Sequence, residues 1–205
     1  MKYCYLILYL FIIASCKESK KQLPYYDTAD FTPKWEMSNE KTFHQIRPFK
    51  LINQENQLFT ERDIEGKICV ADFFFTTCPG ICLKMTNSMY DIQKEFFNDD
   101  EILLLSHSVT PEKDSVPVLK QYAIKHHVND QKWNLVTGDK KAIYAMARKS
   151  YLAVKLGKPE ELYDMVHTEN FVLVDQKRRV RGFYDGTNKE DVQRLIEDIA
   201  FLSEQ

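Results

Sequence analysis

The most constraining feature of this chain is a continuous apolar run that ends in two closely spaced cysteines. Residues 68–75 read Ile-Cys-Val-Ala-Asp-Phe-Phe-Phe. A run of this length without polar alternation is typical of a central strand that is covered on both faces. Cys78 and Cys82 follow it, separated by proline, glycine and isoleucine. The sequence therefore predicts two thiols at the point where a buried strand turns into a helix.

The rest of residues 46–205 alternates strand-like with helix-like segments. Strands that alternate with helices favour an α/β domain of three layers. The last two strands form a hairpin, which makes the central sheet mixed, and an earlier hairpin extends the domain at its N-terminal side. This order predicts a thioredoxin-like fold. Strands are expected at 49–52, 58–60, 68–75, 102–105, 133–136, 171–175 and 180–184, and helices at 83–97, 114–126, 140–151 and 189–202.

Residues 1–16 have the pattern of a lipoprotein signal peptide. Lys2 gives a positive start, residues 5–13 are almost all apolar, and Ile-Ala-Ser before Cys16 resembles a lipobox. The apolar run is shorter than the ~20 residues that span a bilayer, so we expect cleavage before Cys16 rather than an uncleaved anchor. Lipid on Cys16 would hold the protein on a membrane outside the cytoplasm, facing the periplasm.

Residues 17–45 are polar, contain two prolines and show no period. This composition predicts a tether between membrane and domain. Phe31, Trp35 and Phe43 are large and apolar, which leaves room for an irregular extension that packs on the domain.

The charge pattern argues against a nucleic-acid partner. The net charge is −2 and acids and bases are interspersed. The one basic cluster, Lys177, Arg178, Arg179 and Arg181, is interpreted as a solvated hairpin turn, with a docking patch for an acidic partner as the alternative.

The cysteines of the chain are expected to have different roles, according to the segment in which each one lies. Cys4 leaves with the signal peptide and Cys16 carries lipid, so Cys69, Cys78 and Cys82 remain in the domain. Cys69 lies inside the apolar strand and is expected to be a small buried hydrophobe. The pair Cys78 and Cys82 is left to carry the chemistry.

A dithiol at a helix start can bind metal or exchange disulfides. The thiolate is the reactive form, and the partial positive charge of a helix N-terminus favours it. A spacing of four puts Cys82 one turn after Cys78, so both sulfurs can face one ion. Soft thiolates favour Cu(I), and imidazole suits copper in either oxidation state. A structural disulfide is the plainer alternative. His167 is the candidate third ligand, against His44, His107, His126 and His127, of which His107 is a candidate neighbour of the site.

Asp72 lies in the buried strand, six residues before Cys78. Thioredoxins resemble this arrangement, with an acid at the same offset that handles a proton for the resolving cysteine. A carboxyl group in apolar surroundings has a raised pKa and can act as a base. The alternative is that Asp72 lies at the strand edge, paired or in contact with water.

Residues 73–82, which read Phe-Phe-Phe-Thr-Thr-Cys-Pro-Gly-Ile-Cys, resemble the copper-binding motif of the SCO/SenC family, the assembly factors of cytochrome c oxidase. The chain departs from that family at Gly80 and Val166, where an acid is common, and at Leu83, where proline is common. Further segments resemble the family in the same order, at 108–114, 118–122, 133–139 and 166–168, the last with the position of the family's histidine ligand.

The resemblance implies a thioredoxin-like fold and one copper ion, Cu(I) or Cu(II), held by Cys78, Cys82 and His167. The function that it implies is delivery of copper to the CuA centre of oxidase subunit II or to another copper protein, or reduction of that centre's cysteines.

Two functions compete on these residues. The first is a membrane-tethered copper metallochaperone, which is not an enzyme. The second is a thiol–disulfide oxidoreductase, in which Cys78 attacks, Cys82 resolves and His167 is dispensable. A peroxidase related to the peroxiredoxins is a third, weaker hypothesis. A purely structural or binding module is a fourth, but it would leave the dithiol without a role.

Overall fold

The computed structural model describes residues 21–37, 39–40, 42–153 and 168–205. Within these ranges no helix combines the length and the apolar character that crossing a membrane requires.

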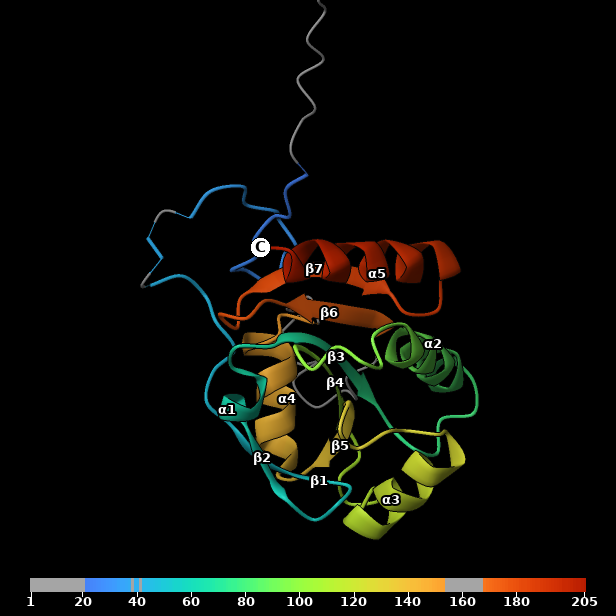
Figure 1. Ribbon diagram of the computed structural model, residues 1–205. Helices are drawn as coiled ribbons and strands as arrows, with labels where there is room; N and C mark the ends of the chain where they lie inside the picture. Colours follow the sequence, from blue (N-terminus) through green and yellow to red (C-terminus); the bar gives the residue numbers. More distant parts are fainter. Residues whose placement is uncertain (1–20, 38, 41, 154–167) are drawn as a thin grey trace, which may run out of the picture.

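Within the described residues, seven strands form one sheet and five helices flank it (Figure 1). The strands and helices follow one another as the sequence predicts, except for one short helix that was not expected. Their bounds are β1 Lys50–Asn53, β2 Leu58–Thr60, α1 Glu61–Ile64, β3 Ile68–Phe74, α2 Ile81–Glu95, β4 Ile102–Ser108, α3 Val116–Lys125, β5 Trp133–Thr137, α4 Lys140–Lys149, β6 Asn170–Val174, β7 Val180–Asp185 and α5 Lys189–Ser203.

The sheet is mixed, with the strand order β2-β1-β5-β4-β3-β6-β7. Strands β3, β4 and β5 run parallel, whereas β1 and β6 pair antiparallel to β5 and β3. The β1–β2 and β6–β7 hairpins close the two ends of the sheet. The predicted fold class, a mixed α/β sheet with an early and a late hairpin, is therefore confirmed.

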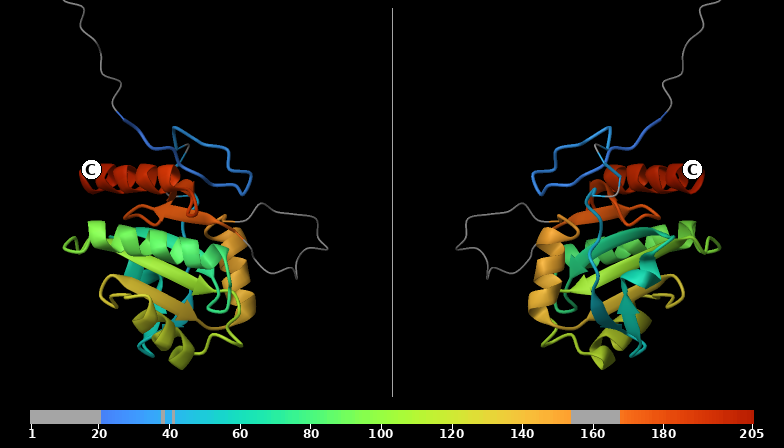
Figure 2. Two further views of the ribbon diagram at one scale, coloured as in Figure 1. Left: turned by 90° about the vertical axis from the view of Figure 1, so that its right-hand side faces the viewer. Right: turned by 90° about the vertical axis from the view of Figure 1, so that its left-hand side faces the viewer.

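Two apolar layers cover the sheet, one on each face. Helices α1 and α4 pack on one face, and α2, α3 and α5 on the other (Figures 1 and 2). All seven residues of β3 are buried, because this strand lies between β4 and β6 with helices on both sides. Cys69 is fully buried in the α1–α4 layer, which confirms its prediction as a core residue.

Side-chain caps explain where several helices begin. Asp139 accepts a hydrogen bond from the amide of Ala142 at the start of α4, and Asn188 caps α5 in the same way. Thr60 and Asp63 form a capping box around α1, which satisfies amides that the first helical turn leaves without partners.

An N-terminal arm, residues 21–37, packs on the edge of the sheet beside β7 and α5 (Figure 2). The amide of Tyr26 donates to the carbonyl of Val180. The ring of Tyr25 lies 4.0 Å from the Arg181 guanidinium. The sequence predicts a tether over 17–45, and part of it, at Leu23, Pro24, Tyr25 and Tyr26, contacts the domain.

The basic hairpin differs from the solvated turn that was expected. Arg179 and Arg181 are buried, and both pair with the buried carboxylate of Asp175. The guanidinium of Arg181 also donates to the carbonyls of Leu23 and Pro24. The arm covers this hairpin and takes two of its four cations out of solvent.

Candidate functional site

The two cysteines lie at the junction of β3 and α2, as the sequence predicts. β3 ends at Phe74, a loop of residues 75–80 follows, and α2 begins at Ile81 after Gly80. Gly80, the N-cap residue of α2, has no side chain that could cap the helix. The first amides of α2 are therefore free to face the sulfurs, since the first turn of a helix leaves backbone donors without internal partners.

The two thiols differ in exposure and in how readily each one ionises. Both are free; Cys82 is buried, with 4% of its surface exposed, whereas Cys78 is partly exposed. The amide of Cys82 lies 3.4 Å from Sγ of Cys78. Burial alone would raise the pKa of Cys78, but hydrogen bonds from the Cys82 thiol and nearby amides outweigh it and lower that pKa.

The second thiol shows the opposite shift. Burial, and then the hydrogen bond to Cys78, raise the pKa of Cys82 to about 12. One sulfur is thus an accessible nucleophile or ligand, and the other is a protected thiol one turn away. This division suits either stepwise disulfide exchange or capture of a soft metal ion.

Asp72 lies behind the dithiol, inside the protein. It is 2% exposed, and alternation along β3 puts it on the face that α2 covers, with Val70 and Phe74. Its Oδ1 finds no hydrogen-bond partner among the described residues. Burial raises the pKa of Asp72 to about 7, against a smaller lowering by Ser106. The strand-edge alternative is wrong, because Asp72 pairs with Ser106 in the middle of the sheet.

His107 does not join the dithiol. Its ring stacks on Phe73 at 4.8 Å and meets Tyr151 at 5.0 Å, in the layer formed by α1 and α4. Burial lowers the pKa of His107 to about 4. The ring is therefore a neutral core group on the face opposite to the cysteines.

Two predicted residues, His167 and Cys16, lie outside the described residues. Among the residues that are described, no group of three or more histidine, cysteine, aspartate or glutamate side chains can hold a metal ion. The described site thus contains two free sulfurs and no further candidate ligand side chain that completes a metal group. Thiolates are soft ligands, so the chemistry of this pair suits Cu(I).

The structure adds polar partners of the site that the sequence did not predict. The Thr86 hydroxyl donates to the carbonyl of Cys82 and lies 2.7 Å from the Tyr122 hydroxyl. Thr76, two residues before Cys78, is bound to Asp114. Segment 108–114 resembles a family motif in the sequence, but the hydrogen bond between its Asp114 and Thr76 of the cysteine loop depends on tertiary structure.

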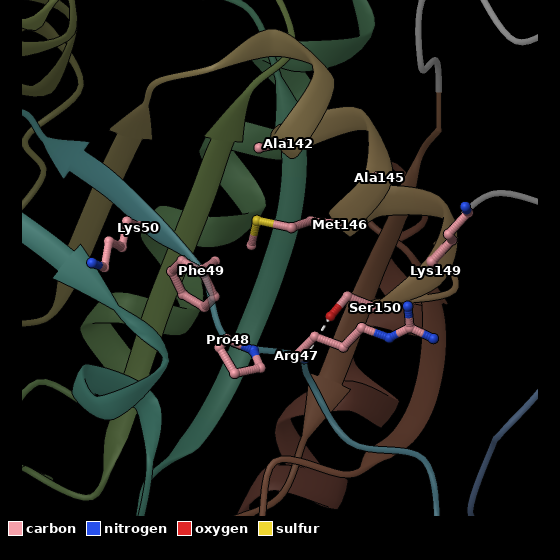
Figure 3. Close-up of a pocket in the computed structure, with 9 residues that line it drawn as sticks. All are labelled: Arg47, Pro48, Phe49, Lys50, Ala142, Ala145, Met146, Lys149 and Ser150. Atoms are coloured by element: carbon pink, nitrogen blue, oxygen red, sulfur yellow. Dashed lines mark hydrogen bonds between the residues drawn. The ribbon is translucent and has the colours of Figure 1, made fainter.

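A pocket of about 210 Å³ lies away from these residues (Figure 3). Its lining comes from residues 47–50 and from α4 and Ser150, with Phe49 and Met146 among its apolar side chains. Neither cysteine lines it, so it is not the site of the thiol chemistry.

The fold and the site define a class: a thioredoxin-like protein with a free dithiol where a central strand meets a helix. Comparison with known families narrows this class. The family model described as SCO1/SenC matches residues 37–203. The chain therefore belongs to the SCO1/SenC family, as the sequence motifs predicted.

Solved structures agree with this assignment. A SCO1/SenC family lipoprotein from Bacillus anthracis is 30% identical, with a TM-score of 0.68, and the match covers 78% of this chain and 95% of that one. BsSco, described as a member of the Sco family of cytochrome c oxidase assembly proteins with a disulfide switch, is also 30% identical, with a TM-score of 0.67 and coverage of 78% and 94%.

A third structure was solved with copper bound. ScoI from Arabidopsis thaliana is 27% identical to this chain, with a TM-score of 0.61, over 78% of this chain and 98% of the plant protein. Copper-related chemistry in oxidase assembly is therefore the setting of this family.

Proposed function

We propose that this protein is a copper metallochaperone that serves the CuA centre of cytochrome c oxidase, with subunit II as its partner. The observation that carries this proposal is the free, unequal dithiol of Cys78 and Cys82 at the start of α2 in a chain of the SCO1/SenC family. Copper is the cargo, one ion at a time, as Cu(I) or Cu(II). The plant relative with copper bound supports this cargo.

Cys78, Cys82 and His167 are the proposed ligands. Topology supports the histidine, because β6 runs antiparallel beside β3. The chain that enters β6 at Asn170 therefore arrives at the edge of the sheet where β3 gives way to the cysteine loop. His167 precedes that strand by three residues in the sequence, which supports it as the proposed third ligand.

The proposed location is the outer side of a membrane, facing the periplasm, with lipid on Cys16. The lipobox-like sequence before Cys16 supports this, and so does the B. anthracis relative, which is described as a lipoprotein. The packed arm begins within a few residues of Cys16, so the domain would stay near the membrane surface.

A thiol–disulfide oxidoreductase is the second candidate, and Asp72 is the observation that favours it. A buried carboxyl group with its pKa near neutrality can take a proton from a resolving thiol. In this mechanism Cys78 attacks the partner's disulfide and Cys82 resolves the mixed disulfide.

Anaerobic titration of the reduced full-length protein with Cu(I) tests the first proposal. We expect one equivalent to bind tightly, His167→Ala to weaken binding markedly, and His126→Ala, a matched control on α3's C-terminal cap, to leave it unchanged. Binding that is weak, or indifferent to His167, contradicts the copper site. Disulfide-reductase activity that survives in His167→Ala would then support the oxidoreductase.

A further inference from the structure

Asp114 is a fully buried carboxylate beside the cysteine loop, with none of its surface exposed. Its Oδ1 accepts a hydrogen bond from the Thr76 hydroxyl at 2.6 Å. Its Oδ2 accepts from the Ser108 hydroxyl at 2.5 Å and the Thr110 hydroxyl at 3.0 Å. The amide of Thr76 also donates to Oδ2, at 3.3 Å.

Asp114 has no cationic partner in the described part of the chain. Four hydrogen bonds therefore replace the water that it loses on burial. Hydrogen bonds to a charged acceptor are stronger than those between neutral groups, and removing one donor leaves the buried charge less well solvated. The donors around Asp114 are thus held firmly in place.

Asp114 and its donors together draw on three parts of the chain. Thr76 belongs to the loop after β3, and Ser108 is the last residue of β4. Asp114 comes just before Ser115, the N-cap residue of α3. The carboxylate therefore joins the ends of two neighbouring parallel strands to the start of a helix. Thr76 is the member of this cluster nearest to the site, two residues before Cys78.

The position of Cys78 depends on the loop that Thr76 anchors. Sγ of Cys78 accepts from the amide of Cys82 in the first turn of α2, and Gly80, the residue before that helix, provides no side-chain cap. The loop lies between Phe74 and Ile81 without regular structure. An anchor at Thr76 fixes its approach to the helix, and with it the place of the first sulfur relative to the second.

We propose that Asp114 is a positioning residue for the dithiol, acting through Thr76 to hold the loop of residues 75–80. The inference rests on the proposed function, because it assigns Asp114 a part in how strongly Cys78 and Cys82 bind copper. The effect of Asp114 is on the geometry of the loop, and no direct contact with either sulfur is required.

The test compares Cu(I) affinity of the full-length protein with that of Thr76→Val, which removes one hydroxyl and keeps the size of the side chain. We expect affinity to fall about tenfold or more, as the loss of a hydrogen bond to a charged group predicts, and Thr76→Ser to restore it. Asp114→Asn should weaken binding in the same direction.

Tyr184→Phe is the matched control for stability. It removes a hydrogen bond of 2.8 Å to another buried carboxylate, Asp198, on the β7–α5 side of the domain. We expect it to lower the denaturation midpoint without changing Cu(I) affinity. If Thr76→Val lowers stability to a similar extent but leaves affinity unchanged, Asp114 only stabilises the fold and the inference is wrong.

A second readout does not depend on copper. We expect Thr76→Val to move the pH midpoint of Cys78 alkylation upward, because the thiolate loses its place at the helix amides, and Tyr184→Phe to leave it unmoved. If the parent protein binds no copper, the proposed function fails, and this midpoint alone decides the role of Asp114: an unmoved midpoint overturns it.

Discussion

The amide of Cys82 donates to the sulfur of Cys78 across 3.4 Å, so the second cysteine of the pair stabilises the first as a thiolate. Cys82 itself resists ionisation, because burial, and then the side-chain hydrogen bond with Cys78, raise its pKa to about 12. The two residues are therefore an ordered pair, with Cys78 first to react.

This order predicts unequal alkylation. Near neutral pH, iodoacetamide should modify Cys78 about tenfold or more faster than Cys82, since each unit of pKa difference changes the thiolate fraction tenfold. Mass spectrometry of the reduced protein over time measures both rates. Cys82→Ser should keep the fast phase and Cys78→Ser should lose it; a fast phase that persists in Cys78→Ser contradicts the assignment.

Asp72 should make the protein less stable as pH rises. Its pKa is about 7 in the folded protein and about 4 in the unfolded chain. Between these values the unfolded state releases a proton that the folded state keeps, so the free energy of unfolding falls as pH rises through this window.

Asp72→Asn removes this dependence. The free energy of unfolding of the variant minus that of the parent should therefore increase between about pH 4 and about pH 7, by on the order of 2–4 kcal/mol in total. Urea denaturation at several pH values measures the difference. A difference that stays constant across the window would show that Asp72 ionises normally in the folded protein.

His107 should give the opposite slope. Burial lowers its pKa to about 4, whereas the unfolded residue titrates near 6.5. Stability is therefore lost as pH falls from about 6.5 to about 4, because the unfolded chain binds a proton that the folded protein excludes. NMR titration of the imidazole checks this directly, and a folded-state midpoint above about 6 would contradict the buried neutral ring.

The ion cluster under the arm should be important for stability. Asp175→Ala leaves the buried cations of Arg179 and Arg181 without their shared carboxylate. Removing one partner from a buried ion pair costs about 3–5 kcal/mol, which urea denaturation can measure. Residues 21–37 should also become sensitive to protease, since Arg181 holds Leu23 and Pro24.

Glu112→Ala is the control for this substitution. Glu112 pairs with Lys140 at the surface, where both side chains are about half exposed, and solvent screens such pairs. We expect little change in stability. A loss for Asp175→Ala no larger than that of Glu112→Ala would show that the buried cluster is not important for the fold.

The sequence predicted the strands and long helices well, because their apolar periods are local properties. β3 is one example, since an unbroken apolar run of this length is typical of a strand covered on both sides. The short helix α1 was missed. Four residues carry too little periodicity to identify a helix, although Thr60 and Asp63 show the capping box that starts it.

The surroundings of single polar residues were harder to predict. The burial of Asp72 depends on α2 lying over its face of the sheet, and that of Arg181 depends on an arm more than 150 positions away in the sequence. The link from Thr76 to Asp114 is of the same kind. His167 as a ligand and Cys16 as the lipid site stay predictions.

X-ray absorption spectroscopy at the copper edge tests the central claim most directly, because it counts the atoms bound to the metal. We predict two sulfurs and one imidazole nitrogen in the Cu(I)-loaded parent protein, with the nitrogen lost in His167→Ala and both sulfurs retained. A spectrum with fewer than two sulfurs, or one that His167→Ala leaves unchanged, would contradict a copper site built from Cys78, Cys82 and His167.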